Sequence, residues 1–208
     1  MILKINPEHP DPAIIDRATG LLESGLTVVA PTETRYGLLV RADRQDRLEA
    51  LYRLKNRDLN RPTALLVPDT DSISRLGRMN PAARILAERF LPGPLTLVLE
   101  AVESWPPPRV VDGRIGIRYS PLGVIRAILG IIDFPLTATS ANISGQAEGE
   151  TVEEIRAGFE DRVELYLDAG PLTGPVSTVV DCSGDTTVIL REGAIPSDAI
   201  RTAVADYD

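Results

Sequence analysis

Short apolar runs rich in β-branched residues alternate along this chain with segments whose apolar residues recur at helical spacing. The runs predict strands at 26–31, 36–40, 63–68, 95–100, 114–119, 136–140, 163–168, 177–181 and 186–190. The periodic segments between them predict helices. Because the two kinds of element intermingle and several strands follow one another through a short turn, we expect one twisted α/β sheet with helices packed against it.

Local signals predict where several helices begin and end. We expect N-caps at Asp11, Asp43 and Asn80, a capping box at Thr151 with Glu154, a helix over 121–129, a last helix opened by Pro196, and a helix stop at Gly25. The segment 104–113 reads SWPPPRVVDG. Its prolines predict a semi-extended, exposed loop, and we expect it to be the most mobile part of the chain.

Size and composition indicate one globular domain over 1–208. The chain has 208 residues, of which 43% are hydrophobic and 25% charged. No apolar run approaches the ~20 residues that a membrane span requires. The first residues also lack the basic and apolar regions of a secretion signal. We therefore expect a cytoplasmic protein with no membrane partner.

Cysteine and histidine are nearly absent, which excludes several kinds of chemistry. Cys182 is the single cysteine and His9 the single histidine. An internal disulfide is therefore impossible, and a zinc site, a Ser-His-Asp triad or a Cys-His pair is disfavoured. The net charge of −8 argues against a general binder of nucleic acid or anionic membranes.

The cations are 20 arginines and two lysines, Lys4 and Lys55. Lys55 lies in RLKNRDLNRP (53–62), a segment with four cations and one acid. Cations near the end of a helix often do no more than complement the helix dipole. Their density here also favours an anion site, because an ammonium and a planar guanidinium both suit the oxygens of a polyphosphate.

Three further polar clusters lie at the ends of predicted strands. They are PTETRYG (31–37) with Thr32 and Thr34, TSANISG (139–145) with Ser140 and Asn142, and the strand ends that carry Arg118, Ser177 and Arg191. Each cluster can be an ordinary turn or a solvated strand end. Strand ends are also where α/β sheets present residues to ligands. The chain has no GxxxxGK[ST] or GxGxxG motif, so a nucleotide would not be held by a P-loop or a Rossmann turn.

Taken in order, seven motifs resemble the YrdC/YciO family, in which a K-x-R segment is followed by S-x-N. They are PTETRYGL, Lys55 with Arg57 and Pro62, PGPLTLVL, RIGIRY, TSANISG, STVVD and ILREGAI. The resemblance implies an α/β fold of the YrdC type, with a twisted, mixed parallel and antiparallel sheet and flanking helices around a large basic cavity. It also implies that the protein forms L-threonylcarbamoyladenylate and pyrophosphate from L-threonine, bicarbonate and ATP, for the t6A modification of tRNA.

The resemblance implies roles for individual residues as well. Lys55 and Arg57 match catalytic positions. The positions that contact ATP in the family are Lys55, Arg57, Arg61, Ser140, Asn142 and Arg191, and those around threonine are Thr34, Arg118 and Ser177. Mg²⁺ is expected to accompany ATP and to be held by the nucleotide, with no protein side chain as a metal ligand. The implied partners are a downstream threonylcarbamoyl transferase complex and, through the basic cavity, tRNA or double-stranded RNA.

Three residues depart from the family pattern. Asp58 stands where proline is usual, Arg35 where a small or apolar residue is usual, and Leu66 where some members have histidine. Such departures are also typical of a divergent YciO-type paralogue without synthase activity. Two other hypotheses are carbamoyl transfer, as in larger proteins that embed this domain beside further catalytic domains, and an RNA-binding, translation-associated module. The net charge disfavours the RNA-binding module.

Overall fold

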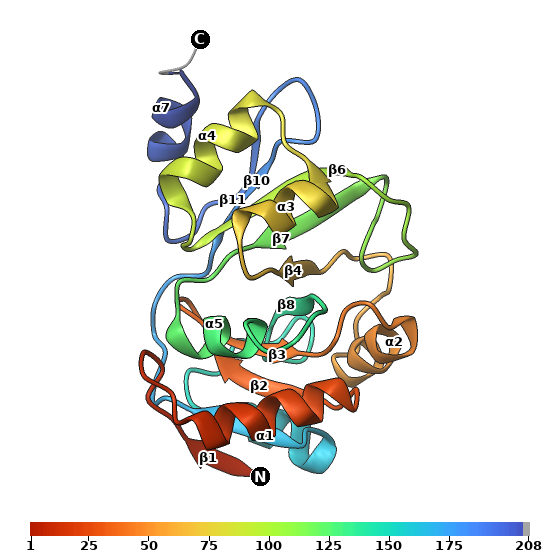
Figure 1. Cartoon of the computed structure of the whole chain (residues 1–208), viewed down its shortest axis with the longest axis vertical. Helices are drawn as coiled ribbons and strands as arrows, with labels where there is room; N and C mark the ends of the chain where they lie inside the picture. The colour runs from red at the N-terminus through yellow and green to blue at the C-terminus, as the bar shows by residue number, and fades with distance from the viewer. Residues whose placement is uncertain (206–208) are drawn as a thin grey trace.

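A computed structural model describes residues 1–205, which form an 11-stranded sheet with helices on both faces (Figure 1). The strands in spatial order are β1 (Ile2–Lys4), β9 (Leu165–Asp168), β2 (Val28–Pro31), β3 (Tyr36–Leu39), β8 (Leu136–Ser140), β4 (Ala64–Leu66), β7 (Arg114–Arg118), β6 (Leu95–Ala101), β10 (Thr178–Asp181) and β11 (Val188–Arg191), and β5 (Gly77–Arg78) pairs with β6. The helices are α1 (Pro12–Glu23), α2 (Gln45–Leu54), α3 (Thr70–Leu76), α4 (Pro81–Phe90), α5 (Gly123–Leu129), α6 (Val152–Phe159) and α7 (Ser197–Ala205), with a 3₁₀ turn at Glu160–Arg162. The predicted domain 1–208 also includes 206–208, which lie outside the described residues.

The sheet is mixed, as the sequence predicts. The pairs β1–β9, β2–β9, β4–β7 and β6–β10 are parallel. The pairs β2–β3, β3–β8, β4–β8, β6–β7, β5–β6 and β10–β11 are antiparallel. All nine predicted strands are present, with ends within about two residues of the prediction, the usual uncertainty of strand and helix boundaries.

Most helix caps follow the local sequence, and one does not. Asn80 accepts a hydrogen bond from the Ala83 amide, and Thr151 forms the predicted capping box. The predicted cap at Asp43 is wrong. Arg41 donates to both Asp43 carboxylate oxygens, at 2.8 and 2.6 Å, and α2 begins one residue later without a side-chain cap. A strong local ion pair thus outcompetes the cap.

The sequence prediction missed β1, α3 and β5, which are all short. The strand β1 has three residues and pairs with β9, more than 160 residues away. The helix α3 has only two large apolar residues, Ile73 and Leu76, and it begins at the side-chain cap of Asp69. Elements this short show too little periodicity to be recognised without their tertiary partners.

Part of the Pro-rich loop is buried, which contradicts the prediction that 104–113 is an exposed loop. Arg109 and Val110 are 8% and 7% exposed. The Arg109 guanidinium stacks on the Trp105 ring at 4.7 Å and donates to the Asp43 carbonyl. The Gln45 side-chain amide also donates to the Pro107 carbonyl, at 2.8 Å. These contacts attach the second half of the loop to the start of α2.

Side chains alternate between the two faces of the sheet, and the faces have different environments. On one face Leu38, Leu65, Leu97 and Ile117 are fully buried, in a core completed by α2, α3, α4, α6 and α7. No helix within residues 1–205 is long and apolar enough to cross a membrane.

The opposite face is only half covered. Beside β2 and β3 it carries Val28, Ala30 and Leu39, which pack under α1 and α5 (Figure 1). Toward β4, β7, β6 and β10 the same face carries small and polar residues, among them Gly116 and Arg118, and it opens into a cavity. The uncovered half of this sheet face is therefore the floor of the cavity.

We expect Ile117→Ala to lower the free energy of unfolding by about 2–5 kcal/mol, because it opens a hole in the covered core. Ile131→Ala is the matched control, since Ile131 is 53% exposed and its truncation should change stability by about 0.5 kcal/mol or less. Urea unfolding measures both. Equal losses would contradict the burial of Ile117 in the covered core.

Candidate active site

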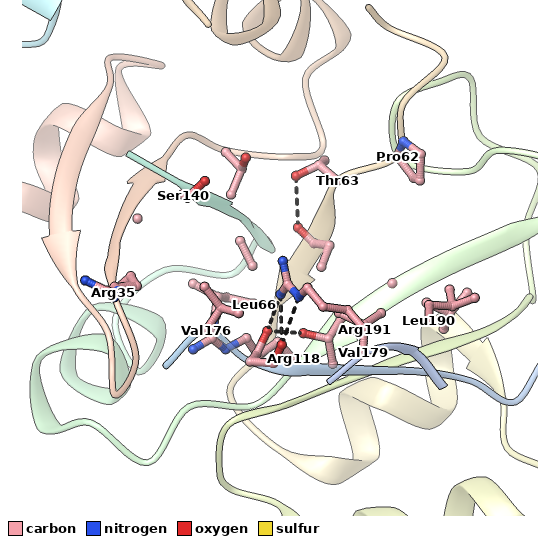
Figure 2. Close-up of a pocket in the computed structure, with 18 of the residues that line it drawn as sticks. Arg35, Pro62, Thr63, Leu66, Arg118, Ser140, Val176, Val179, Leu190 and Arg191 are labelled. Carbon is pink, nitrogen blue, oxygen red and sulfur yellow. Dashed lines mark hydrogen bonds between the residues drawn. The ribbon is translucent and has the colours of Figure 1, made fainter. Parts of the chain in front are cut away.

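The cavity over the open half of the sheet has a volume of about 480 Å³ (Figure 2). Its lining includes five arginines and three carboxylates, namely Arg35, Arg57, Arg114, Arg118, Arg191, Asp112, Glu148 and Asp181. The lining is thus basic within an acidic protein. Such a concave, polar and basic site suits a small anionic ligand.

Small residues on the central strands leave room for the cavity above the sheet. Gly37, Ala64, Gly116 and Ala138 all line it. A Cβ on Gly116 would lie 3.2 Å from the Ala64 Cβ, so even a methyl group would crowd the floor. Leu66, which stands where some family members have histidine, is fully buried at the same floor and pairs in register with Arg118.

The turn between β2 and β3 presents hydroxyl groups to Arg118. Thr32 closes this turn, because its Oγ1 donates to the Arg35 carbonyl at 2.6 Å and accepts from the Arg35 amide at 3.2 Å. The Arg118 Nη2 donates to Thr34 Oγ1 and, at 3.4 Å, to Thr32 Oγ1. The structure therefore brings together Thr34 and Arg118, two of the three residues predicted around threonine.

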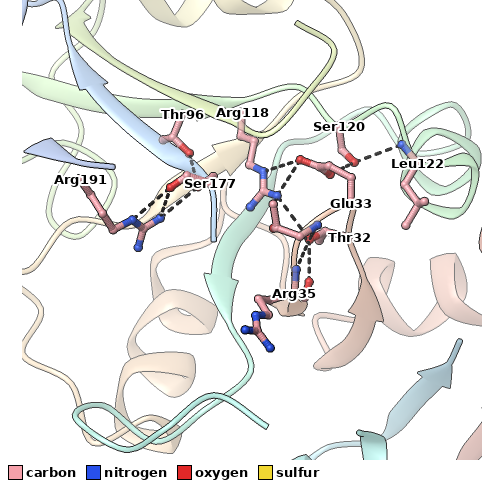
Figure 3. Close-up of polar contacts among 10 residues, drawn as sticks. Thr32, Glu33, Arg35, Thr96, Arg118, Ser120, Leu122, Ser177 and Arg191 are labelled. Atoms are coloured by element: carbon pink, nitrogen blue, oxygen red, sulfur yellow. Dashed lines mark hydrogen bonds and ion pairs between the residues drawn. The ribbon is translucent and has the colours of Figure 1, made fainter. Parts of the chain in front are cut away.

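Arg118 is also held by Glu33, a residue that the sequence prediction did not single out (Figure 3). Glu33 Oε1 accepts from Arg118 Nε at 3.1 Å and Nη2 at 2.7 Å, and Glu33 Oε2 accepts from Ser120 Oγ. The available signal was an acidic residue between the two threonines of PTET, directly after a buried strand. Sequence alone does not show that this carboxylate faces an arginine 85 positions away.

Arg191 and Ser177 form the opposite side of the site. The Arg191 Nε and Nη2 donate to the Ser177 carbonyl at 3.1 and 2.9 Å, and Nη2 also donates to Ser177 Oγ at 3.0 Å. Ser177 Oγ lies 3.1 Å from Thr96 Oγ1. Burial, with a smaller contribution from Arg118, lowers the pKa of Arg191. These contacts position both side chains at the cavity.

Lys55 lies behind the cavity and is not one of its lining residues. It is 1% exposed, and its Nζ donates to the carbonyls of Ser140 and Asn142, the latter at 2.8 Å, and to Asn142 Oδ1 at 3.3 Å. Burial, with the nearby Arg57 charge, lowers the pKa of Lys55 to about 7. Lys55 thus holds the end of β8, where Ser140 lines the cavity, and the start of the turn that follows, where Asn142 lies outside it.

Arg57 reaches the cavity and Arg61 does not. The Arg57 Nη2 donates to the Pro62 carbonyl at 2.8 Å, and its guanidinium lies 5.5 Å from the centre of the Tyr52 ring. Its buried Nε has no hydrogen-bond partner among residues 1–205. Arg61 has an exposed side chain and contributes its carbonyl to the Tyr52 hydroxyl.

The other two departures from the family pattern lie at the edge of this site. Arg35 donates to the Leu172 carbonyl at 2.7 Å and to Glu150 at 3.3 Å, which ties together two loops beside the cavity. Asp58 accepts from the Asn60 amide and lines a separate groove beside α2. The Asp58 carboxylate is therefore not among the charges that line the cavity.

These features define an α/β protein with a basic cavity that presents several arginines and hydroxyls to a ligand. The sequence profile of the Sua5/YciO/YrdC family, described as telomere recombination, matches residues 20–193. The chain therefore belongs to this family.

Similar proteins include both short and long members. A protein of Methanocaldococcus jannaschii is 34% identical over 83% of this chain and 82% of its own length. The threonylcarbamoyl-AMP synthase of Bacillus subtilis is 32% identical over 93% of this chain, but only 57% of that protein is matched. This chain thus spans little more than half of the Bacillus enzyme.

Two solved structures have the same fold. Sua5 from Pyrococcus abyssi in complex with L-threonine superposes with a TM-score of 0.88 at 30% identity, over 98% of this chain and 60% of that one. YciO from Escherichia coli superposes with a TM-score of 0.85 at 25% identity, over 96% and 98% of the two chains. These matches confirm the predicted fold class.

The buried ammonium of Lys55 predicts a pH-dependent stability. Its pKa is lowered from 10.5 to about 7, so between these values the unfolded chain binds more protons than the folded one. The free energy of unfolding should therefore rise with pH in this window, by up to about 1.4 kcal/mol per pH unit relative to Lys55→Met. Below pH 7 the full cost of burying the charge is present.

Urea unfolding of the wild type and Lys55→Met at several pH values measures this difference. Lys4→Met is the control, because Lys4 is the other lysine and is exposed. The free energy of unfolding of Lys4→Met, relative to the wild type, should not change with pH. If the corresponding value for Lys55→Met were also independent of pH, the lowered pKa of Lys55 would be contradicted.

Proposed function

We propose that this protein is an L-threonylcarbamoyladenylate synthase, which forms threonylcarbamoyl-AMP and pyrophosphate from L-threonine, bicarbonate and MgATP. One observation carries the proposal: a single cavity is lined by Arg118, which hydrogen-bonds to Thr34, and also by Arg57, Ser140 and Arg191. The first cluster suits an amino acid, and the second group suits a polyphosphate. The name of the Bacillus enzyme and the L-threonine in the P. abyssi complex support it.

The reaction needs positioning and charge neutralisation more than acid–base catalysis. Bicarbonate first loses water to give carbon dioxide, and the amine of L-threonine then captures the carbon dioxide, losing a proton and forming a carbamate. A carbamate oxygen then attacks the α-phosphorus of ATP, and the bond from that phosphorus to the pyrophosphate oxygen breaks. Cations that hold the phosphates favour both attack and departure. The scarcity of histidine in this chain is compatible with that chemistry.

Each side chain has a role that its position supports. Arg118 receives the threonine carboxylate, with Thr34 and Ser177 beside it. Arg57 and Arg191 bind the phosphates of ATP, whose Mg²⁺ arrives with the nucleotide. Ser140 contacts ATP, and Lys55 acts indirectly, since its ammonium holds the end of β8, where Ser140 lies.

The chemistry of the product indicates which kind of reaction uses it. Threonylcarbamoyl-AMP is a mixed anhydride of a carbamate and a phosphate, so it is activated for transfer to a nucleophile. We propose that a threonylcarbamoyl transferase complex uses it to modify tRNA. In this proposal the tRNA binds to the transferase, and this chain supplies the activated group.

The test is to incubate the protein with MgATP, L-threonine and bicarbonate and to detect threonylcarbamoyl-AMP and pyrophosphate by mass spectrometry. Both should appear only when all three substrates are present. Arg191→Ala should reduce kcat/KM for ATP on the order of 100-fold, because it removes a cation from the phosphates.

Arg118→Ala should mainly raise the KM for L-threonine. The control is Arg201→Ala, whose side chain is 68% exposed and pairs with Asp198 away from the cavity. It should leave the kinetics unchanged. Absence of product, or product formation that does not depend on threonine, would reject the proposal.

A further inference from the structure

The five arginines of the cavity differ in how their charges are compensated. Arg35 pairs with Glu150 at 3.3 Å, Arg114 with Asp181 at 3.1 Å, and Arg118 with Glu33 at 2.7 Å. Within residues 1–205, Arg57 and Arg191 form no ion pair, although Glu148 lies near enough to influence Arg191. Among the described residues, the cavity thus contains two guanidinium groups without an ion pair and three with one.

The Arg118–Glu33 pair is the most enclosed of the three. Its side chains are 10% and 11% exposed, against 21% and 48% for Arg35 and Glu150, and 51% and 11% for Arg114 and Asp181. Charges shielded from water are less screened by solvent and salt. Glu33 therefore cancels the field of Arg118 more completely than the other carboxylates cancel the fields of their partners.

The geometry of the pair leaves one edge of Arg118 available. Glu33 and the turn hydroxyls occupy Nε and Nη2, whereas Nη1 makes no hydrogen bond to any residue in 1–205 (Figure 3). Ser120 fixes the other carboxylate oxygen, and its Oγ in turn accepts from the Leu122 amide at 3.3 Å. Glu33 is therefore held in place from two sides.

We propose that Glu33 is a specificity-determining residue, which neutralises Arg118 so that this part of the cavity accepts the single negative charge of an amino-acid carboxylate and rejects phosphate. The proposal rests on the proposed function, because it explains how one basic cavity sorts an amino acid from a polyphosphate. A carboxylate still gains directed hydrogen bonds from Arg118. A multiply charged phosphate is repelled by Glu33 and is directed to Arg57 and Arg191.

Without Glu33 the sorting should fail. Arg118 and Arg191 line the same cavity, and the Arg118 charge contributes to lowering the pKa of Arg191. With Glu33 uncharged, a second cationic site would therefore be available to phosphate within the cavity. Phosphate would then compete with the amino acid for Arg118.

The deciding variant is Glu33→Gln, which removes the charge but keeps an oxygen to accept from Arg118 and an amide to donate to Ser120. Inorganic pyrophosphate and L-threonine are the probes, measured by titration calorimetry without turnover. In the wild type we expect one pyrophosphate site and no displacement of L-threonine by pyrophosphate. In Glu33→Gln we expect a second pyrophosphate site and a loss of L-threonine affinity of about tenfold or more at saturating pyrophosphate.

Glu150→Gln is the matched control, since it removes one negative charge from the more exposed pair with Arg35 beside the same cavity. It should leave a single pyrophosphate site. If Glu33 were only structural, Glu33→Gln would behave like this control, and the proposal would be overturned. A second site in both variants would also overturn it, because a general change of cavity charge would then suffice.

Two measurements keep the test decisive. Thermal unfolding shows whether Glu33→Gln is folded. If it is not, the wild type is titrated with L-threonine and pyrophosphate together. Displacement of L-threonine by pyrophosphate would contradict the proposal, and simultaneous binding of the two would support it. Counting pyrophosphate sites does not depend on catalysis. A protein that makes no threonylcarbamoyl-AMP but gains a second site in Glu33→Gln would reject the proposed function and retain the sorting role of Glu33.

Discussion

The strict alternation of side chains along the central strands is the constraint on which the rest of this structure depends. In β7, Ile115 and Ile117 face the covered core, and Gly116 and Arg118 face the cavity. A shift of one residue in this strand would turn the arginine toward the apolar core and the isoleucines toward the cavity. The same packing that stabilises the sheet therefore fixes the orientation of the binding groups.

Several charged side chains that this arrangement buries are paired with groups that are distant in sequence. The carbonyls of Ser140 and Asn142 accept hydrogen bonds from the Lys55 ammonium, and Glu33 forms an ion pair with Arg118. Among residues 1–205, Arg57 and Arg191 line the cavity without an ion pair, within a chain whose net charge is −8. The net charge describes the whole surface, so it excluded a broad anion-binding surface and did not exclude a local phosphate site.

Predictions from sequence succeeded where the deciding contacts are local. The cap at Asn80 and the capping box at Thr151 depend on residues three positions apart, and both are confirmed. The short strand β1 was missed because its partner is distant, and the cap at Asp43 was wrong because Arg41 competes for the carboxylate. For the site, the ordered motifs placed Arg118 and Arg191 correctly at the cavity, while the position of Lys55 behind it depends on tertiary contacts.

The sequence by itself determined the family, the mixed α/β sheet and the scarcity of histidine and cysteine, because these follow from ordered motifs, periodicity and composition. Only the tertiary structure decided which half of a sheet face stays uncovered, and which arginines there are paired. Helix placement and ion pairing join residues far apart in the chain. Glu33 and Arg118 are 85 positions apart, and no local pattern records that they meet.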